Sequence, residues 1–119
     1  MSQRATVLVV DDDADTVDTM REILADEGHV VLCAKDGREA LEVARDSSPD
    51  LVLLDLNMAG MDGRAFLAEV QAEPALAALK VVVISGADDT HDLPCECVHK
   101  PLRLHTLLGL IKKVARFAH

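Results

Sequence analysis

Aromatic side chains are almost absent from this 119-residue chain, which contains two Phe and neither Trp nor Tyr. Any hydrophobic core must therefore be built from Val, Leu, Ile and Ala. Half of the residues are apolar, which is too many for a disordered chain. The length fits one domain, and we expect residues 1–119 to form it.

Basic residues are also scarce, because 12 Lys and Arg face 21 Asp and Glu and the net charge is −9. Binding to a duplex requires clustered Lys and Arg that displace counterions. The basic residues near the end, Lys112, Lys113 and Arg116, are better explained as the last turns of a helix, where they complement its dipole. Direct nucleic-acid binding by this chain is therefore not expected.

Long apolar runs are missing as well. No stretch approaches the roughly 20 residues that cross a bilayer, and no apolar signal segment follows Met1. The three cysteines are an odd number, which indicates reduced thiols. These features predict a cytoplasmic protein without membrane contact.

Short apolar runs, by contrast, recur along the chain. The runs at 7–10, 51–54 and 81–84 consist only of Val, Leu and Ile, and a weaker run covers 95–99. Continuous runs of this kind are typical of parallel strands covered on both faces. We predict strands at 6–10, 30–34, 51–54, 80–84 and 96–99, alternating with helices. The fold class is then α/β, a doubly wound three-layer sandwich.

Helical periodicity places an apolar face on each intervening segment. The first helix turns Val17, Met20, Ile23 and Leu24 inward, starts near a capping Asp13, and ends at Gly28. Further helices are predicted from the turn at Asp36 to residue 45 and over 64–72. A last helix covers 102 to about 117, and its predicted core face consists of Leu104, Leu107, Leu108, Ile111 and Val114.

A polar residue stands at the end of each central strand. Asp11 and Asp12 follow the first run, Asp55 the third, and Ser85 and Lys100 the last two. The carboxyl ends of parallel strands share one edge of the sheet, so these side chains should converge there. Three carboxylates, a hydroxyl and an ammonium predict a site for a cation and a phosphate. Without a metal ion the carboxylates would repel one another, and at least one pKa should rise.

These residues occur in the order typical of a known family. The chain resembles the receiver domain of two-component response regulators, the flavodoxin-like module typified by the chemotaxis response regulator, with strand order 2-1-3-4-5. The matching segments cover nearly the whole chain and are Val10-Asp11-Asp12, Leu54-Asp55-Leu56-Asn57-Met58, Gly60-Met61-Asp62-Gly63, Ser85-Gly86 and Lys100-Pro101.

The resemblance implies a role for each residue of the site. Asp55 would accept a phosphoryl group, and Ser85 and Lys100 would contact that group. Mg²⁺ would be held by Asp12, by Asp11 partly through water, by Asp55, and by the backbone carbonyl of Asn57.

The resemblance also implies partners and a manner of working. The phosphoryl donor would be a histidine kinase or a phosphotransfer protein. A downstream protein or an output domain would receive the signal. The domain would catalyse only its own phosphorylation and dephosphorylation, as a switch in a phosphorelay and not as a turnover enzyme.

Two departures from the family pattern change these expectations. Cys97 stands where receiver domains usually carry a switching aromatic residue. Only 14 residues, 86–99, separate Ser85 from Lys100, and about ten remain once a short strand is subtracted. We therefore predict that the fourth helix of the family is missing or very short. Its loss would expose Leu and Val on the sheet, which makes a homodimer possible.

Other functions compete with this prediction. An interaction module of the same fold could signal without phosphorylation, although the intact acidic set argues against it. A flavin carrier would need aromatic rings for stacking, and it would not place Asp residues after the first strand. Zinc binding by His91, Cys95, Cys97 and His99 is disfavoured because their spacing matches no common zinc finger.

Overall fold

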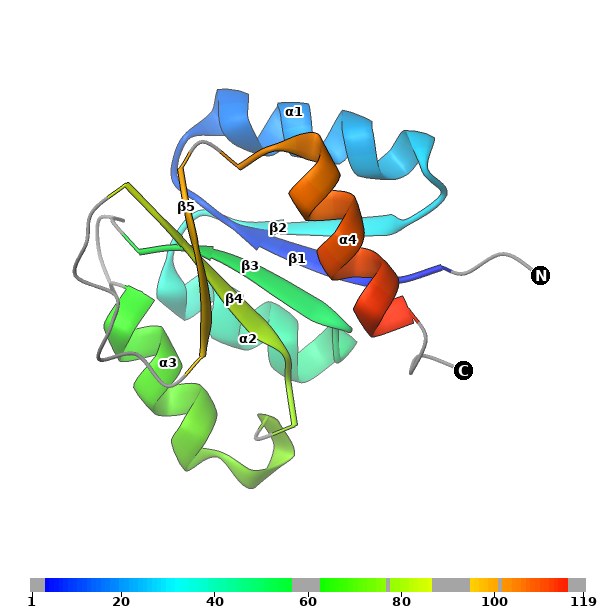
Figure 1. The fold of residues 1–119 in the computed structure, drawn as a ribbon. Helices are drawn as coiled ribbons and strands as arrows, with labels where there is room; N and C mark the ends of the chain where they lie inside the picture. Colours follow the sequence, from blue (N-terminus) through cyan, green and yellow to red (C-terminus); the bar gives the residue numbers. More distant parts are fainter. Residues whose placement is uncertain (1–3, 57–62, 77, 87–94, 101, 116–119) are drawn as a thin grey trace.

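A single parallel sheet of five strands forms the centre of the molecule (Figure 1). The computed structural model describes residues 4–56, 63–76, 78–86, 95–100 and 102–115. The strand order is β2-β1-β3-β4-β5, which confirms the predicted fold class and order. The strands are β1 (Thr6–Val10), β2 (Val30–Ala34), β3 (Leu51–Asp55), β4 (Val81–Ser85) and β5 (Glu96–His99).

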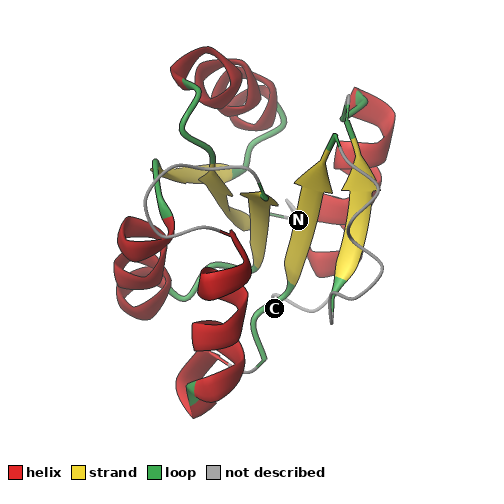
Figure 2. Ribbon diagram, turned by 90° about the vertical axis from the view of Figure 1, so that its left-hand side faces the viewer, coloured by secondary structure: helices red, strands yellow, loops and turns green. Residues whose placement is uncertain are grey.

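Helices cover both faces of the sheet, as Figure 2 shows from the side. Helices α1 (Ala14–Asp26) and α4 (Leu104–Ala115) lie on one face. Helices α2 (Gly37–Ser47) and α3 (Gly63–Ala72) lie on the other, and a short 3₁₀ turn, η1 (Pro74–Leu76), follows α3. The three inner strands, β1, β3 and β4, bury side chains against both helix layers, which explains why their runs at 7–10, 51–54 and 81–84 are apolar at every position.

Two separate hydrophobic clusters result from the alternation of side chains along each strand. Val7, Val9 and Leu53 pack on the side of α1 and α4, together with Leu107 and Ile111. Leu8, Val52 and Leu54 pack on the side of α2 and α3, where the fully buried Phe66 lies. A nearly aromatic-free core is therefore filled by aliphatic side chains in two layers.

Helix boundaries follow the capping residues expected from the sequence. Asp13 caps α1 and accepts a hydrogen bond from the N–H of Asp15 at 3.3 Å. Asp36 caps α2 and accepts from the N–H of Glu39 at 2.8 Å. Gly28 follows α1 with φ of 88°, the left-handed conformation that glycine adopts without strain. Because Asp13 serves as the cap, Asp11 and Asp12 are available for other contacts.

The last helix differs from its prediction in where it begins and which face it buries. It starts at Leu104, and the Leu104 side chain is 52% exposed. Leu110 is buried instead, together with Leu107 and Ile111. These three positions form an i, i+3, i+4 set that faces the sheet. Leu104 lies three residues before Leu107 on the same side of the helix, but it is exposed, so its predicted burial was wrong.

The connection between β4 and β5 begins at Gly86 and ends at Cys95. Residues 87–94 lie outside the described part of the chain, so the loss of a fourth helix stays a prediction. All five residues of β4 are buried, whereas β5 is partly exposed. The exposed Leu and Val patch that suggested a homodimer is therefore not found on β4. Among the described residues, no helix combines the length and the apolar character needed to cross a membrane.

Candidate functional site

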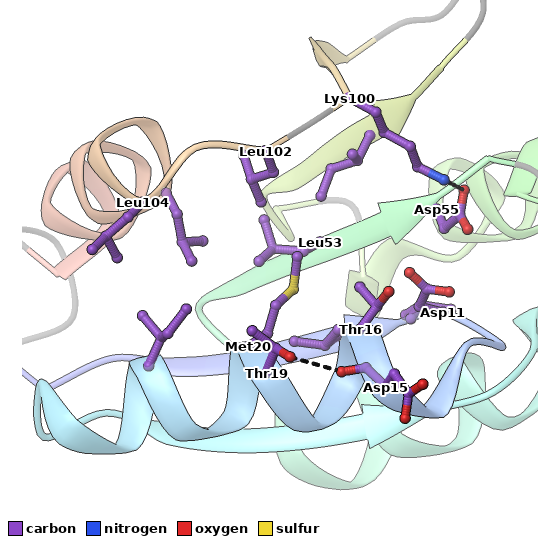
Figure 3. A pocket seen from close by; sticks show the side chains of 15 residues that line it. Asp11, Asp15, Thr16, Thr19, Met20, Leu53, Asp55, Lys100, Leu102 and Leu104 are labelled. Atoms are coloured by element: carbon purple, nitrogen blue, oxygen red, sulfur yellow. Dashed lines mark hydrogen bonds and ion pairs between the residues drawn. The ribbon is translucent and has the colours of Figure 1, made fainter.

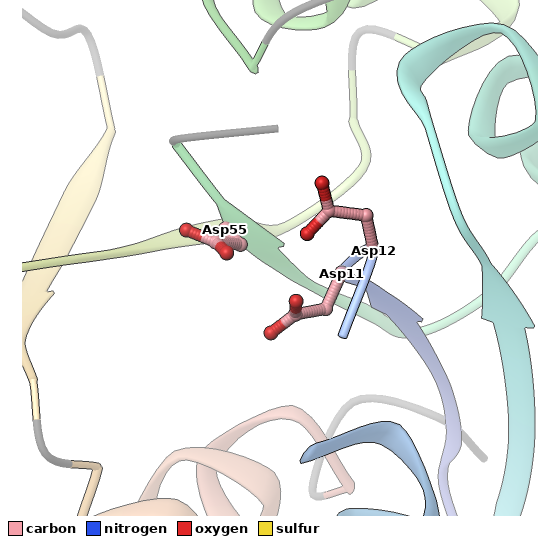
Figure 4. Close-up of side chains that lie close together, drawn as sticks. All are labelled: Asp11, Asp12 and Asp55. Carbon is pink, nitrogen blue, oxygen red and sulfur yellow. The ribbon is translucent and has the colours of Figure 1, made fainter. Parts of the chain in front are cut away.

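Three carboxylates meet at the carboxyl edge of the sheet (Figure 4). Asp55 is the last residue of β3, and Asp11 and Asp12 follow β1. One oxygen atom from each lies within 4.8 Å of the other two. Asp55 is 6% exposed, Asp11 is half-buried and Asp12 is exposed. The structure thus confirms the convergence that the strand ends predicted.

Hydrogen bonds on both sides fix the position of Asp11. Its backbone N–H donates to the carbonyl of Ala34 at 3.0 Å, which continues the ladder between β1 and β2. Its carboxylate Oδ1 accepts from the N–H of Asp13 at 2.9 Å. Since Asp13 is itself held as the cap of α1, the Asp11 side chain is anchored to a helix as well as to a strand.

The charge state of Asp11 reflects its crowded surroundings. Burial raises the pKa of this carboxyl above its ordinary value, and the negative charges of Asp55 and Asp12 act in the same direction. The hydrogen bond from Asp13 and the positive charge of Lys100 oppose the rise without cancelling it. A pKa in the acidic cluster is therefore raised at Asp11, as expected, although burial contributes more to the rise than the predicted repulsion.

Lys100 and Ser85 complete the site from the adjacent strands. The Lys100 Nζ lies 3.2 Å from Asp55 Oδ1, as the dashed line in Figure 3 shows. The backbone N–H of Lys100 donates to the carbonyl of Ser85 at 2.9 Å. Ser85 is 1% exposed at the end of β4, whereas the Lys100 side chain is 43% exposed. A buried hydroxyl-bearing residue and a partly solvated ammonium therefore flank the phosphoacceptor predicted from the sequence.

The donor set fits Mg²⁺. All three converging side chains offer carboxylate oxygens, the ligands that Mg²⁺ prefers. Three carboxylates and one ammonium, −3 + 1, leave a formal charge of −2 to be neutralised. The predicted fourth ligand, the backbone carbonyl of Asn57, lies outside the described residues. Within the described chain, the Cys and His residues of β5 form no comparable ligand group, and His91 is not described.

Cys97 occupies β5 at the position where the family pattern has an aromatic residue. It is half-buried against the cluster on the α2 and α3 side, and its Sγ donates to the carbonyl of Cys95 at 3.4 Å. Burial raises the pKa of the Cys95 thiol to about 11, and the neighbouring Cys97 adds to the rise. The Cys95 thiol is therefore protonated at neutral pH, which suits an apolar packing role for this residue.

Gly63 is part of the site in a way that the sequence analysis missed. The sequence pattern includes it only as the last residue of the matching segment Gly60-Met61-Asp62-Gly63 and gives it no role. A Cβ atom at this position would lie 3.1 Å from the Leu56 Cα and 3.4 Å from the Asp55 carbonyl oxygen. The close approach of Gly63 to Leu56, seven residues earlier, cannot be predicted from the periodicity or the composition of the sequence.

A cavity of about 620 Å³ extends from the acidic cluster into the space between α1 and α4 (Figure 3). Asp11, Asp55 and Lys100 line its polar end. Apolar side chains line the other end, including Met20, Ile23, Leu102, Leu104 and Leu107. Asp11, Asp55 and Lys100 are therefore accessible from this open cavity.

Known proteins share both the sequence pattern and the fold. The family model of the response regulator receiver domain matches residues 7–111. The transcriptional regulatory protein ZraR of Escherichia coli K12 is 34% identical over 118 residues, which cover 95% of this chain and 27% of that protein. A protein-glutamate methylesterase/protein-glutamine glutaminase of Myxococcus xanthus is 40% identical over 110 residues, 84% of this chain and 31% of that protein. This chain thus spans less than a third of either relative.

Solved structures agree with the family. The chemotaxis response regulator CheY4 of Vibrio cholerae superimposes with a TM-score of 0.83 at 27% identity, covering 93% of this chain and 98% of that one. A signal receiver domain of a histidine kinase from Syntrophus aciditrophicus gives a TM-score of 0.85 at 25% identity, covering 95% and 91%. The match over residues 7–111, the strand order and the acidic edge lead to one conclusion: the chain belongs to the response regulator receiver domains, which act in two-component phosphorelay signalling.

Proposed function

We propose that Asp55 is the phosphoacceptor of this receiver domain and that the site works with Mg²⁺. The observation that carries the proposal is the placement of Asp55. Its carboxylate is buried, lies next to those of Asp11 and Asp12, and has the Lys100 ammonium 3.2 Å away. A buried acid in a purely structural role would not need two further acids beside it.

The reaction is transfer of a phosphoryl group from a phosphohistidine. A carboxylate oxygen of Asp55 forms a new bond to phosphorus, and the bond between phosphorus and the imidazole nitrogen breaks. The imidazole keeps the electron pair and takes up a proton. Because an anion attacks an anionic group, neutralisation of charge is the main catalytic requirement.

Residues at the edge of the sheet meet this requirement. Lys100 places a positive charge where the oxygens of the transferred group would lie, and Ser85 offers a hydroxyl from the neighbouring strand. Asp11, Asp12 and Asp55 would hold Mg²⁺, which supplies further positive charge to the phosphoryl oxygens. The Asn57 carbonyl stays a predicted ligand.

The partners follow from the chemistry of the donor and from the family. A histidine kinase or a phosphotransfer protein would supply the phosphoryl group, and a downstream protein or an output domain would read the modified state. The domain would act as a switch that modifies only itself, in the cytoplasm, without direct contact to nucleic acid. This chain corresponds to about a quarter to two fifths of its curated relatives, so an output domain is proposed and not assigned.

Acetyl phosphate and Mg²⁺ provide the direct test. Intact-protein mass spectrometry should show one added phosphoryl group on the unmodified sequence and none on Asp55→Asn. Asp50→Asn is a matched control, because Asp50 accepts from the N–H of Thr6 at the opposite end of the sheet and the Asn amide oxygen can accept as well. This variant should be labelled like the unmodified chain, and EDTA should abolish labelling in both.

The competing interpretation predicts the opposite result. An interaction module that signals without phosphorylation would show no added phosphoryl group with acetyl phosphate or with a phosphorylated kinase. Labelling that persists in Asp55→Asn would place the acceptor elsewhere and would contradict the proposal equally.

A further inference from the structure

We infer that Gly63 is a positioning residue for Asp55: its missing side chain allows the first turn of α3 to close onto the Asp55–Leu56 peptide. The inference deepens the proposed function and rests on it. Asp55 ends β3, and Gly63 begins α3. Gly63 and Leu56, which stand at the two ends of the connection between β3 and α3, therefore lie close together next to Asp55.

The distances leave no room for a methyl group. A Cβ atom on Gly63 would lie 3.1 Å from the Leu56 Cα, 3.1 Å from the Leu56 Cδ1 and 3.4 Å from the Asp55 carbonyl oxygen. Rotation of the Leu56 side chain would relieve only the second contact. The first involves backbone, so relief requires the peptide after Asp55 or the start of α3 to move by a few tenths of an ångström.

Backbone conformation does not explain this glycine. Gly28 has a positive φ, whereas Gly63 is the first residue of a right-handed helix, a conformation that any residue can adopt. Alanine is the better helix former, so local preference alone would favour it at this position. The close approach to Leu56 is therefore the reason for glycine.

The peptide that would be displaced is held tightly on its other side. The N–H of Leu56 donates to the carbonyl of Ile84 at 3.2 Å, and the Leu56 side chain is 6% exposed. Asp55 itself is paired with Lys100 Nζ at 3.2 Å. A shift of this peptide would thus change how the Asp55 carboxylate lies relative to the lysine and to the other two acids.

The test compares two glycine-to-alanine changes. Gly63→Ala should be labelled by acetyl phosphate about tenfold more slowly at saturating Mg²⁺, because small misplacements of a reacting group are costly. It should also bind Mg²⁺ severalfold more weakly. Gly109→Ala is the matched control, since a Cβ there meets nothing within 4 Å. Its labelling rate and Mg²⁺ affinity should equal those of the unmodified chain.

A slower reaction of Gly63→Ala could come from lower stability of the domain or from a displaced Asp55, and a second variant separates the two causes. Leu67 is buried on the same helix, so Leu67→Ala should weaken the packing of α3 without adding an atom near Asp55. Rates are compared at a temperature where circular dichroism shows every variant folded. In that state Leu67→Ala should be labelled at the normal rate and Gly63→Ala slowly.

If Gly63→Ala does not fold alone, it is measured together with Gly109→Ala, which should raise the denaturation midpoint. Normal labelling of folded Gly63→Ala would overturn the inference, and so would a double variant that still fails to fold, because the glycine would then serve folding only. An unmodified chain that is never labelled would instead overturn the proposed function.

Discussion

Charged side chains have different surroundings at the two ends of the sheet. At the carboxyl end, Asp11, Asp12 and Asp55 crowd together, and the pKa of Asp11 is raised, first by burial and then by the charges of these neighbours. At the amino end, acidic and polar groups have complementary partners. Asp50 Oδ2 accepts from the N–H of Thr6 at 2.7 Å, and His29 Nδ1 accepts from the N–H of Ala5 at 3.1 Å.

The difference separates residues that stabilise the fold from residues that perform chemistry. Asp50 supplies an acceptor to a backbone N–H at the start of β1, so this hydrogen bond favours the folded state. Asp11 and its neighbours repel one another, so their charges oppose folding until a cation joins them. Removal of an Asp carboxylate at the amino end should therefore lower stability and leave metal binding unchanged. Removal of one at the carboxyl end should weaken metal binding.

The largest expected effect is on metal affinity at the carboxyl end. Asp12→Asn should weaken Mg²⁺ binding by at least about tenfold, because a charged oxygen ligand is replaced by a neutral one. Titration calorimetry measures this affinity, with Asp50→Asn as the control at the opposite end of the sheet. Equal affinities for Asp12→Asn and the unmodified chain would remove Asp12 from the metal site.

The next effect is on stability at the amino end. Asp50→Ala should lower the free energy of unfolding by about 1–3 kcal/mol, because the N–H of Thr6 loses its acceptor. Urea denaturation measures the loss. Mg²⁺ affinity should stay unchanged in this variant; a joint loss of stability and affinity would show that the two ends are not independent.

A smaller effect of opposite sign is expected at Asp11. In EDTA at neutral pH, Asp11→Asn should be more stable than the unmodified chain, with a gain smaller than the loss at Asp50. The amide can still accept from the N–H of Asp13, while the repulsion of Asp55 and Asp12 is removed. Urea denaturation in EDTA checks the sign, and a destabilised variant would contradict the electrostatic account.

The pH dependence gives the same comparison in another form. Because the pKa of Asp11 is higher in the folded state than its ordinary value, the folded state binds this proton more tightly than the unfolded state. The stabilisation that results from this tighter proton binding is fully present below the ordinary pKa of 3.8. It is lost as the pH rises through the pKa of Asp11 in the folded state. Urea denaturation in EDTA at several pH values should show this loss, and Asp11→Asn should not.

The smallest effect is expected at a solvated ion pair near the amino end. Lys80 Nζ lies 3.3 Å from Glu96 Oε1, and the two side chains are 48% and 37% exposed. Lys80→Met should change the free energy of unfolding by no more than about 0.5 kcal/mol, since solvent and salt screen such pairs. The change should shrink further in high salt; a large, salt-insensitive loss would point to packing by the lysine stem.

Most of the fold and the gathering of the site could be predicted because both depend on local pattern. Continuous runs such as Leu51 to Leu54 are typical of strands buried on both faces, and Asp13 and Asp36 cap helices through bonds that span two or three residues. Parallel strands then bring Asp11 and Asp55 to one edge by topology alone.

The features that were missed depend on contacts between distant segments. Leu104 fits the periodicity of a buried face, yet it is exposed, since it lines the open cavity between α1 and α4. Gly63 belongs to a matching segment of the sequence, while its closeness to Leu56 exists only after β3 and α3 have packed. Neither fact can be obtained from residue types and spacing, because each depends on where a helix axis lies in space.

The ladder bond between Lys100 and Ser85 has a mechanical consequence. The outermost strand is fastened to its inner neighbour at the very residues that approach Asp55. A displacement of the main chain at either residue would therefore be transmitted to the other strand through this bond. Such a link between the two strand ends would require no aromatic side chain to change position.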